Sequence, residues 1–123
     1  MVTEYEKIQV EGDDKYVVVT CLEKTIGLGS PELGWAEEMN EVVQSIGRRA
    51  LIVDFTVVNV ISSSVIQCLI RYLFSAKKED RKFILCGLRD DIYNSLQMMR
   101  IADLFTITDD VASAKILLEK SCD

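Results

Sequence analysis

The sequence predicts an α/β fold in which strands and helices alternate around one mixed sheet. Two strand-like segments come first, and from Ala50 onward strand and helix patterns take turns to the end of the chain. That order, ββαβαβαβα, is typical of a largely parallel sheet with right-handed crossovers. We expect four or five strands and about four helices. A chain of 123 residues without a linker or repeat predicts a single domain over residues 1–123.

The first two strands are expected to pair as a hairpin. Apolar and polar residues alternate in the strand predicted over residues 5–10, whereas the strand over 15–22 contains a continuous apolar run. The GDD sequence at 12–14 between them is a turn signal. The first strand should therefore lie at an edge of the sheet.

A glycine-containing loop, TIGLGSPELG at residues 25–34, leads into the first helix. It lacks the GxGxxG and GK[ST] patterns of phosphate-binding loops. Ser30 fits the cap of a helix and Pro31 its first position. Trp35 then suits either packing in the first turn or an exposed anchor for a partner. The predicted apolar face, before Gly47 ends the helix, is Leu33, Ala36, Met39, Val42, Val43 and Ile46.

The remaining elements follow in regular alternation. A nearly all-apolar strand over residues 50–58 is expected at the centre of the sheet, because apolar side chains occupy both of its faces. The next helix, over 62–76, should bury Val65, Ile66, Leu69, Ile70, Leu73 and Phe74. We then expect a strand over 83–86, a helix over 90–99 with Met99 inward, a strand over 104–107, and a last helix capped by Asp109 or Asp110 with Leu117 on its buried face.

Composition argues against several classes of function. The net charge of −6 disfavours nucleic acid and anionic lipid as partners. The absence of histidine removes the commonest general base and metal ligand, and the four cysteines form no CxxC pair. The N-terminus is too polar for a signal peptide, and no apolar run is long enough for membrane insertion. We expect a cytoplasmic protein with no cofactor, no metal and no enzymatic turnover.

Three consecutive serines, Ser62, Ser63 and Ser64, open the helix that follows the central strand. Serine hydroxyls at this position cap the free N–H groups of a helix. The same helix end favours negative charge and therefore suits a phosphate. Local chemistry is compatible both with simple capping and with a serine switched by phosphorylation.

Six segments from residue 51 onward stand in a specific order: LIVDF, ISSS, VIQCLIRYL, FILCGL, MRIADLFTI and VASAKILL. Each is a weak signal alone. Together, in their order and spacing, they resemble the STAS domain of bacterial anti-sigma factor antagonists. The resemblance covers nearly the whole chain and is strongest over residues 50–120. It implies a regulatory module that binds a protein partner, such as an anti-sigma factor serine kinase, as a monomer or weak dimer.

The resemblance also implies site residues. It places the family's phosphorylated serine at Ser62, with Ser63 and Ser64 as alternates, and a partner-binding surface at Asn59, Ile61 and the three serines. Two positions depart from the family motif, since Ile61 stands where the family has aspartate and Ser64 where it has glycine. A STAS scaffold without phosphorylation is therefore an alternative.

Asp54 supports a different class of function, a small flavodoxin-like nucleotide-binding or enzymatic domain. A carboxylate at the end of a strand, together with the loop Gly27–Gly29, would serve such a site. Asp54 has no histidine and no clear second carboxylate nearby in sequence, so no acid–base pair is visible. The STAS resemblance also supplies an aspartate there without catalysis.

Overall fold

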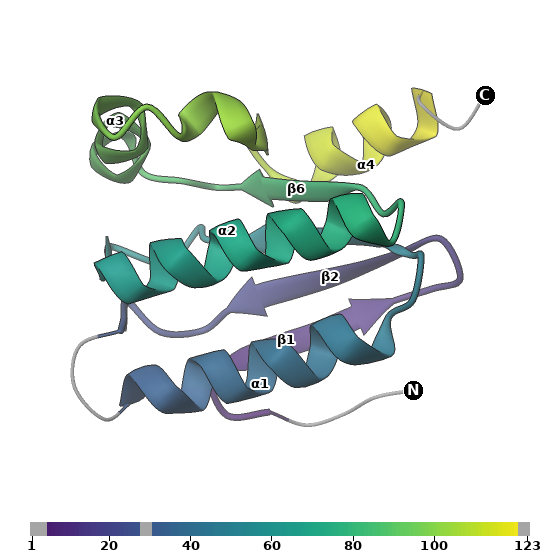
Figure 1. The fold of residues 1–123 in the computed structure, drawn as a ribbon, viewed down its shortest axis with the longest axis horizontal. Coiled ribbons are helices and arrows are strands. Elements are labelled where there is room, and N and C mark those ends of the chain that lie inside the picture. Colours follow the sequence, from purple (N-terminus) through teal and green to yellow (C-terminus); the bar gives the residue numbers. More distant parts are fainter. Residues whose placement is uncertain (1–4, 28–30, 121–123) are drawn as a thin grey trace.

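The computed structural model describes residues 5–27 and 31–120. Its main sheet has five strands in the order β1-β2-β4-β6-β7, with helices packed against it (Figure 1). Strands β1 and β2 are antiparallel, and the other neighbouring pairs are parallel. The bounds are β1 Ile8–Gly12, β2 Tyr16–Cys21, β4 Ala50–Asp54, β6 Phe83–Cys86 and β7 Thr106–Thr108. The predicted mixed sheet, with the hairpin's first strand at an edge, is confirmed.

Four α-helices and a short second sheet complete the described residues. Helices α1 and α2 lie side by side over one face of the main sheet (Figure 1). The second sheet pairs β3 (Thr25–Ile26) with β5 (Val60–Ile61). The helices are α1 Pro31–Ser45, α2 Ser63–Lys78, α3 Asp90–Met98 and α4 Val111–Lys120, and a 3₁₀ turn, η1, spans Ala102–Leu104.

The core has two layers because successive side chains of a strand point to opposite faces. Val17, Leu51 and Leu85 face α1 and α2, where Trp35 and Leu69 are fully buried among them. The opposite face is smaller. It joins Val18, Ile52, Ile84 and Cys86 to two residues of α4, Ala114 and Leu118. Alternating apolar runs in the sequence thus become a sheet covered on both sides.

Several element boundaries were wrong, and the first strand, predicted over residues 5–10, spans Ile8–Gly12. The strand predicted over residues 50–58 ends at Asp54, because the Asp54 carboxylate accepts hydrogen bonds from the N–H and Oγ1 of Thr56 and turns the chain. The strand predicted over 104–107 begins at Thr106, because η1 occupies the residues before it.

Three side chains predicted to lie on the buried faces of helices are exposed. Phe74 is 60% exposed on the outer side of α2, and Leu117 is 40% exposed because α4 packs through Ala114 and Leu118. Met99 is 51% exposed, since it forms the C-cap of α3 and the chain then turns through Arg100, whose φ is 61°. The Ser30 cap predicted for α1 falls outside the described residues.

None of the helices in the described ranges combines the length and apolar character that a membrane crossing requires.

Candidate functional site

One backbone hydrogen bond and one side-chain cap hold Ser62 at the start of α2. Its N–H donates to the carbonyl of Ile26 in β3 at 3.1 Å. Its own backbone is extended (φ −87°, ψ 167°), and its Oγ accepts from the N–H of Val65 at 3.4 Å. Ser62 is therefore the N-cap of α2, so the capping role suggested by the sequence is confirmed.

The hydroxyl of Ser62 has two close neighbours. Its Oγ lies 2.7 Å from the Oγ of Ser64, at hydrogen-bonding distance. On the other side lies the backbone of Gly27, which has a φ of 92°, and a methyl group on Gly27 would overlap the Ser62 hydroxyl. The half-buried Ser62 side chain is thus fixed between a loop and its own helix.

The other two serines open on different sides of α2. Ser63 is exposed and lines a cavity of about 270 Å³ shared with Asn59, Ile61 and Asp91, on the side of α3. Ser64 lines a larger cavity of about 420 Å³ between α2 and α1. The start of α2 therefore stands between two cavities, with Ser63 lining one and Ser64 the other.

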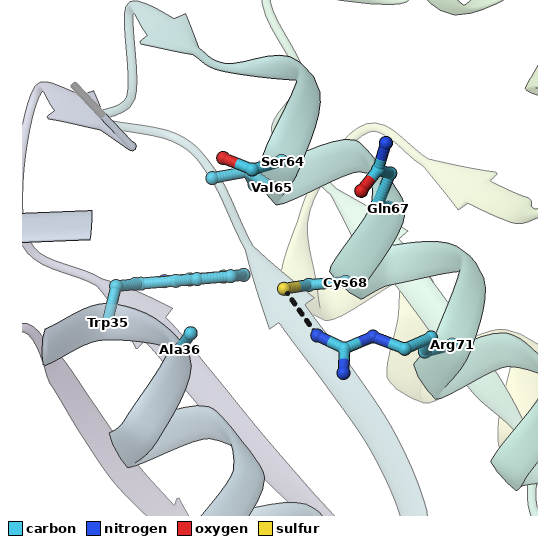
Figure 2. A pocket seen from close by; sticks show the side chains of 7 residues that line it. All are labelled: Trp35, Ala36, Ser64, Val65, Gln67, Cys68 and Arg71. Atoms are coloured by element: carbon cyan, nitrogen blue, oxygen red, sulfur yellow. Dashed lines mark hydrogen bonds between the residues drawn. The ribbon is translucent and has the colours of Figure 1, made fainter. Parts of the chain in front are cut away.

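Figure 2 shows the larger cavity. The side chain of Trp35 reaches from α1 toward Cys68 of α2, and the Nη2 of Arg71 donates to the Cys68 Sγ at 3.0 Å. Trp35 is 1% exposed, and its ring centroid lies 6.5 Å from that of Tyr72. Trp35 is a packing residue, as one of the two sequence interpretations had it, and it forms a wall of the cavity.

Asn59 is exposed next to the serines and is held from two directions. Its N–H donates to the Lys24 carbonyl at 2.7 Å, and its Oδ1 accepts from the Nη1 of Arg89 at 3.2 Å. The Nε of Arg89 also pairs with Asp91 at 3.3 Å. The loop before the serines is therefore anchored to the start of α3, which sequence reasoning did not anticipate.

An exposed apolar rim borders this loop. Val57 and Val60 are 45% and 46% exposed, on either side of the buried Val58 and the polar Asn59. Sequence reasoning placed Val57 inside a buried strand and so missed it. The signal that could have found the rim is the Asp-x-Thr sequence at 54–56, which favours a turn there.

Ile61 is half-buried and packs against the core beneath α1 and α2 as well as against the smaller cluster around Ile66 and Leu96. It also pairs with Ile26 in the second sheet. The apolar side chain of Ile61 thus joins two parts of the core.

Asp54 stands at the end of β4, near Gly87 and Cys86. The Oδ1 of Asp54 accepts a hydrogen bond from the Thr56 N–H at 2.9 Å. Burial raises the pKa of the Cys86 thiol to about 12, and the nearby Asp54 charge is a smaller cause of that rise. The geometry gives Asp54 a role in the turn. Within residues 5–27 and 31–120, no group of three His, Cys, Asp or Glu side chains gathers to hold a metal. The loop Gly27–Gly29 lies partly outside the described residues.

Comparison with known proteins identifies the family of this fold. The STAS domain model matches residues 8–114. The fold is similar to an anti-sigma-factor antagonist STAS domain protein from Planctomyces limnophilus, with a TM-score of 0.78 and 19% identity over 91% of this chain and 97% of that one. It is also similar to a serine-to-glutamate variant of RsbS from Moorella thermoacetica, with a TM-score of 0.76 and 18% identity over 94% and 97%. The chain belongs to the STAS domain family.

Proposed function

We propose that this protein is a regulatory interaction module of the anti-sigma factor antagonist kind, without enzymatic turnover, in the bacterial cytoplasm. Its partner is an anti-sigma factor serine kinase or a related regulator. Phosphorylation of Ser62 controls the contact. The observation that carries the proposal is the place of Ser62, which caps α2 between two cavities in a STAS frame.

The electrostatics at the start of α2 suit a phosphate. The first turn of α2 contains no acidic side chain, so no neighbouring charge there opposes a phosphate at the positive end of the helix dipole. A phosphoserine adds about −1.5 to −2 charges at neutral pH. The helix end would stabilise that charge by roughly 0.3–1 kcal/mol at an exposed position.

Phosphorylation would also change the shape of the site. The Ser62 hydroxyl now lies against Gly27 and bonds to the Ser64 hydroxyl, and a phosphoryl group does not fit in that space. The modified side chain has to swing outward. A partner seated on Val57, Val60 and Asn59 would then meet both a new charge and a displaced side chain, and would be released without unfolding of the module.

A second candidate is a STAS scaffold that is not phosphorylated. It is favoured by Ile61, which packs in the core where the family has aspartate, and by the engagement of the Ser62 hydroxyl with Ser64. In this case the same surface would bind a partner constitutively.

Two measurements separate these functions. Intact-mass analysis of protein purified from the native host should find one phosphate on the wild type and on Ser63→Ala, and none on Ser62→Ala. Titration of the purified kinase of that host should give about tenfold weaker binding to Ser62→Asp than to wild type or Ser63→Asp. No phosphate on any of the three serines, with equal binding by all variants, would establish the scaffold instead.

A further inference from the structure

A cavity of about 430 Å³ lies at the opposite end of the main sheet from the serines. We call it the amino-end cavity, because its walls include Tyr16 and Ala50, which begin β2 and β4, and Lys82, which directly precedes β6. The serines instead follow the carboxyl end of β4. A volume of this size is within the range of small-molecule sites.

Four cationic side chains line the amino-end cavity. Lys15, Arg48, Lys82 and Lys115 come from four separate segments that the fold brings together. The ion pairs found among the described residues are Lys7–Glu23 and Arg89–Asp91, so none of the four is neutralised by a salt bridge within that part of the chain. This gathering of cations is notable in a chain whose net charge is −6.

The cavity is also lined by three carboxylates, one fewer than its cations. Asp13 accepts the N–H groups of Lys15 and Tyr16 at 2.8 and 3.2 Å. These backbone hydrogen bonds, with the charges of Lys15 and Lys115 as smaller causes, hold the pKa of Asp13 below the usual value. Asp80 and Glu119 are exposed. The cations therefore outnumber the carboxylates, and one of the three carboxylates is already satisfied by the backbone.

An aromatic ring and an apolar wall lie beside the cations. The Nζ of Lys115 stands 5.2 Å from the centroid of the Tyr16 ring, in a cation–π contact that places its charge at the cavity. Ala50 and Leu118 are buried side chains of the same wall. The cavity thus offers positive charge and apolar surface together.

We propose that the amino-end cavity binds a small phosphorylated molecule with an apolar or aromatic body. The phosphate lies among Arg48, Lys82 and Lys115, whose guanidinium and ammonium groups donate charged hydrogen bonds to its oxygens. The body lies against Tyr16 and the apolar wall. The proposal does not depend on partner binding at the serines, which are at the other end of the sheet.

The test is a ¹⁵N NMR titration of the full chain at constant ionic strength, with phenyl phosphate and inorganic phosphate as probes. Saturable shifts are expected at the backbone amides of residues 15–16, 48–50, 82 and 115–119. Phenyl phosphate should bind about threefold more tightly than inorganic phosphate, because its ring adds buried apolar area. Lys82→Gln and Arg48→Gln should each weaken phenyl phosphate binding about tenfold.

Lys24→Gln and Lys77→Gln are the matched controls, since both remove one exposed lysine outside the cavity. Their binding should equal that of the wild type, and a wild-type pattern of amide shifts in every variant shows that it is folded. Shifts that do not saturate at millimolar probe, or losses as large in the controls as in the cavity variants, would overturn the proposal and leave only general attraction of anions to lysines.

Discussion

At the scale of single residues, the position of Gly27 determines what Ser62 can do. Three glycines in the described residues have positive φ, and two of them, Gly27 at 92° and Gly47 at 63°, form a matched pair. A methyl group on Gly47 would meet nothing within 4 Å, whereas one on Gly27 would overlap Ser62. An alanine at Gly47 would therefore introduce backbone strain alone, whereas an alanine at Gly27 would introduce strain and a steric clash with Ser62.

We expect Gly27→Ala to be more destabilising than Gly47→Ala. Strain alone should lower the free energy of unfolding of Gly47→Ala by about 1–2 kcal/mol. Gly27→Ala adds a clash with the Ser62 hydroxyl, worth about 1–3 kcal/mol more. Urea denaturation of both variants measures the difference. Equal losses would mean that the loop moves away from Ser62 without cost.

Ser62→Ala and Ser63→Ala form a second matched pair. Removing the Ser62 hydroxyl should lower the free energy of unfolding by about 1 kcal/mol, because the N–H of Val65 loses its capping acceptor. Ser63 is exposed, and its replacement should change stability by less than about 0.5 kcal/mol. Thermal melting of the two variants tests this, and a larger loss for Ser63→Ala would refute the assignment of the cap.

The serines themselves were predictable, and their arrangement was not. Hydroxyls before an apolar helix pattern are a local signal, so Ser62 could be assigned as a cap from the sequence. The contact between Ser62 and Gly27 depends on the pairing of β3 with β5, two strands of two residues each. Pairings that short leave no periodic pattern to read.

At the scale of elements, α2 shows how periodicity overestimates burial. The apolar positions of its predicted stripe include Leu73 and Phe74, which are neighbours in sequence but lie about 100° apart around a helix. Leu73 points into the core and is 6% exposed, whereas Phe74 is 60% exposed. An apolar stripe wider than the surface it packs on leaves its outer edge in solvent.

Alanine substitution of these two residues should separate core from surface. Leu73→Ala should lower the free energy of unfolding by about 2–5 kcal/mol, through lost burial and the cavity left behind. Phe74→Ala should change it by no more than about 0.5 kcal/mol. Denaturant midpoints at matched m-values provide the measurement. A large loss for Phe74→Ala would mean that another surface covers this side chain in solution.

At the scale of the whole molecule, the fold class followed from the order of strand and helix patterns. The strand Phe83–Cys86 was predicted with its observed bounds because turn signals and charges border a short apolar run. The break after Asp54 was missed because Val57 and Val58 continue the apolar pattern while the chain leaves the sheet. The order of strand and helix patterns predicts which segments form the sheet. It does not show where the chain leaves the sheet.

Stability toward acid depends on carboxylates that cap turns and helices. Backbone hydrogen bonds lower the pKa of Asp13 and of Asp110, whose Oδ1 accepts the Ser113 N–H at 2.7 Å. A lowered folded-state pKa contributes stability above the unfolded value of 3.8, and that contribution is lost as pH falls through the folded pKa.

Asp110→Asn should reduce this dependence on pH. Asparagine keeps a capping oxygen but does not titrate, so stability near neutral pH should change little. The wild type should then lose more free energy of unfolding than the variant between about pH 5 and pH 2. Urea denaturation at both pH values measures the two losses. Parallel losses would show that the Asp110 carboxylate does not contribute.

The register of β4 has a consequence for how the chain reaches its fold during synthesis. Val17 pairs with Leu51, and Leu51 pairs with Phe83, so about 30 residues separate β4 from each parallel neighbour. The β1–β2 hairpin can close as soon as it leaves the ribosome, but β4 keeps one open edge until β6 has been translated. A nascent chain paused between these strands displays an apolar strand with unpaired backbone groups, the state most prone to join a neighbouring nascent copy. Translation through the segment between Asp54 and Phe83 is therefore an interval in which the open edge of β4 exposes the nascent chain to misassembly.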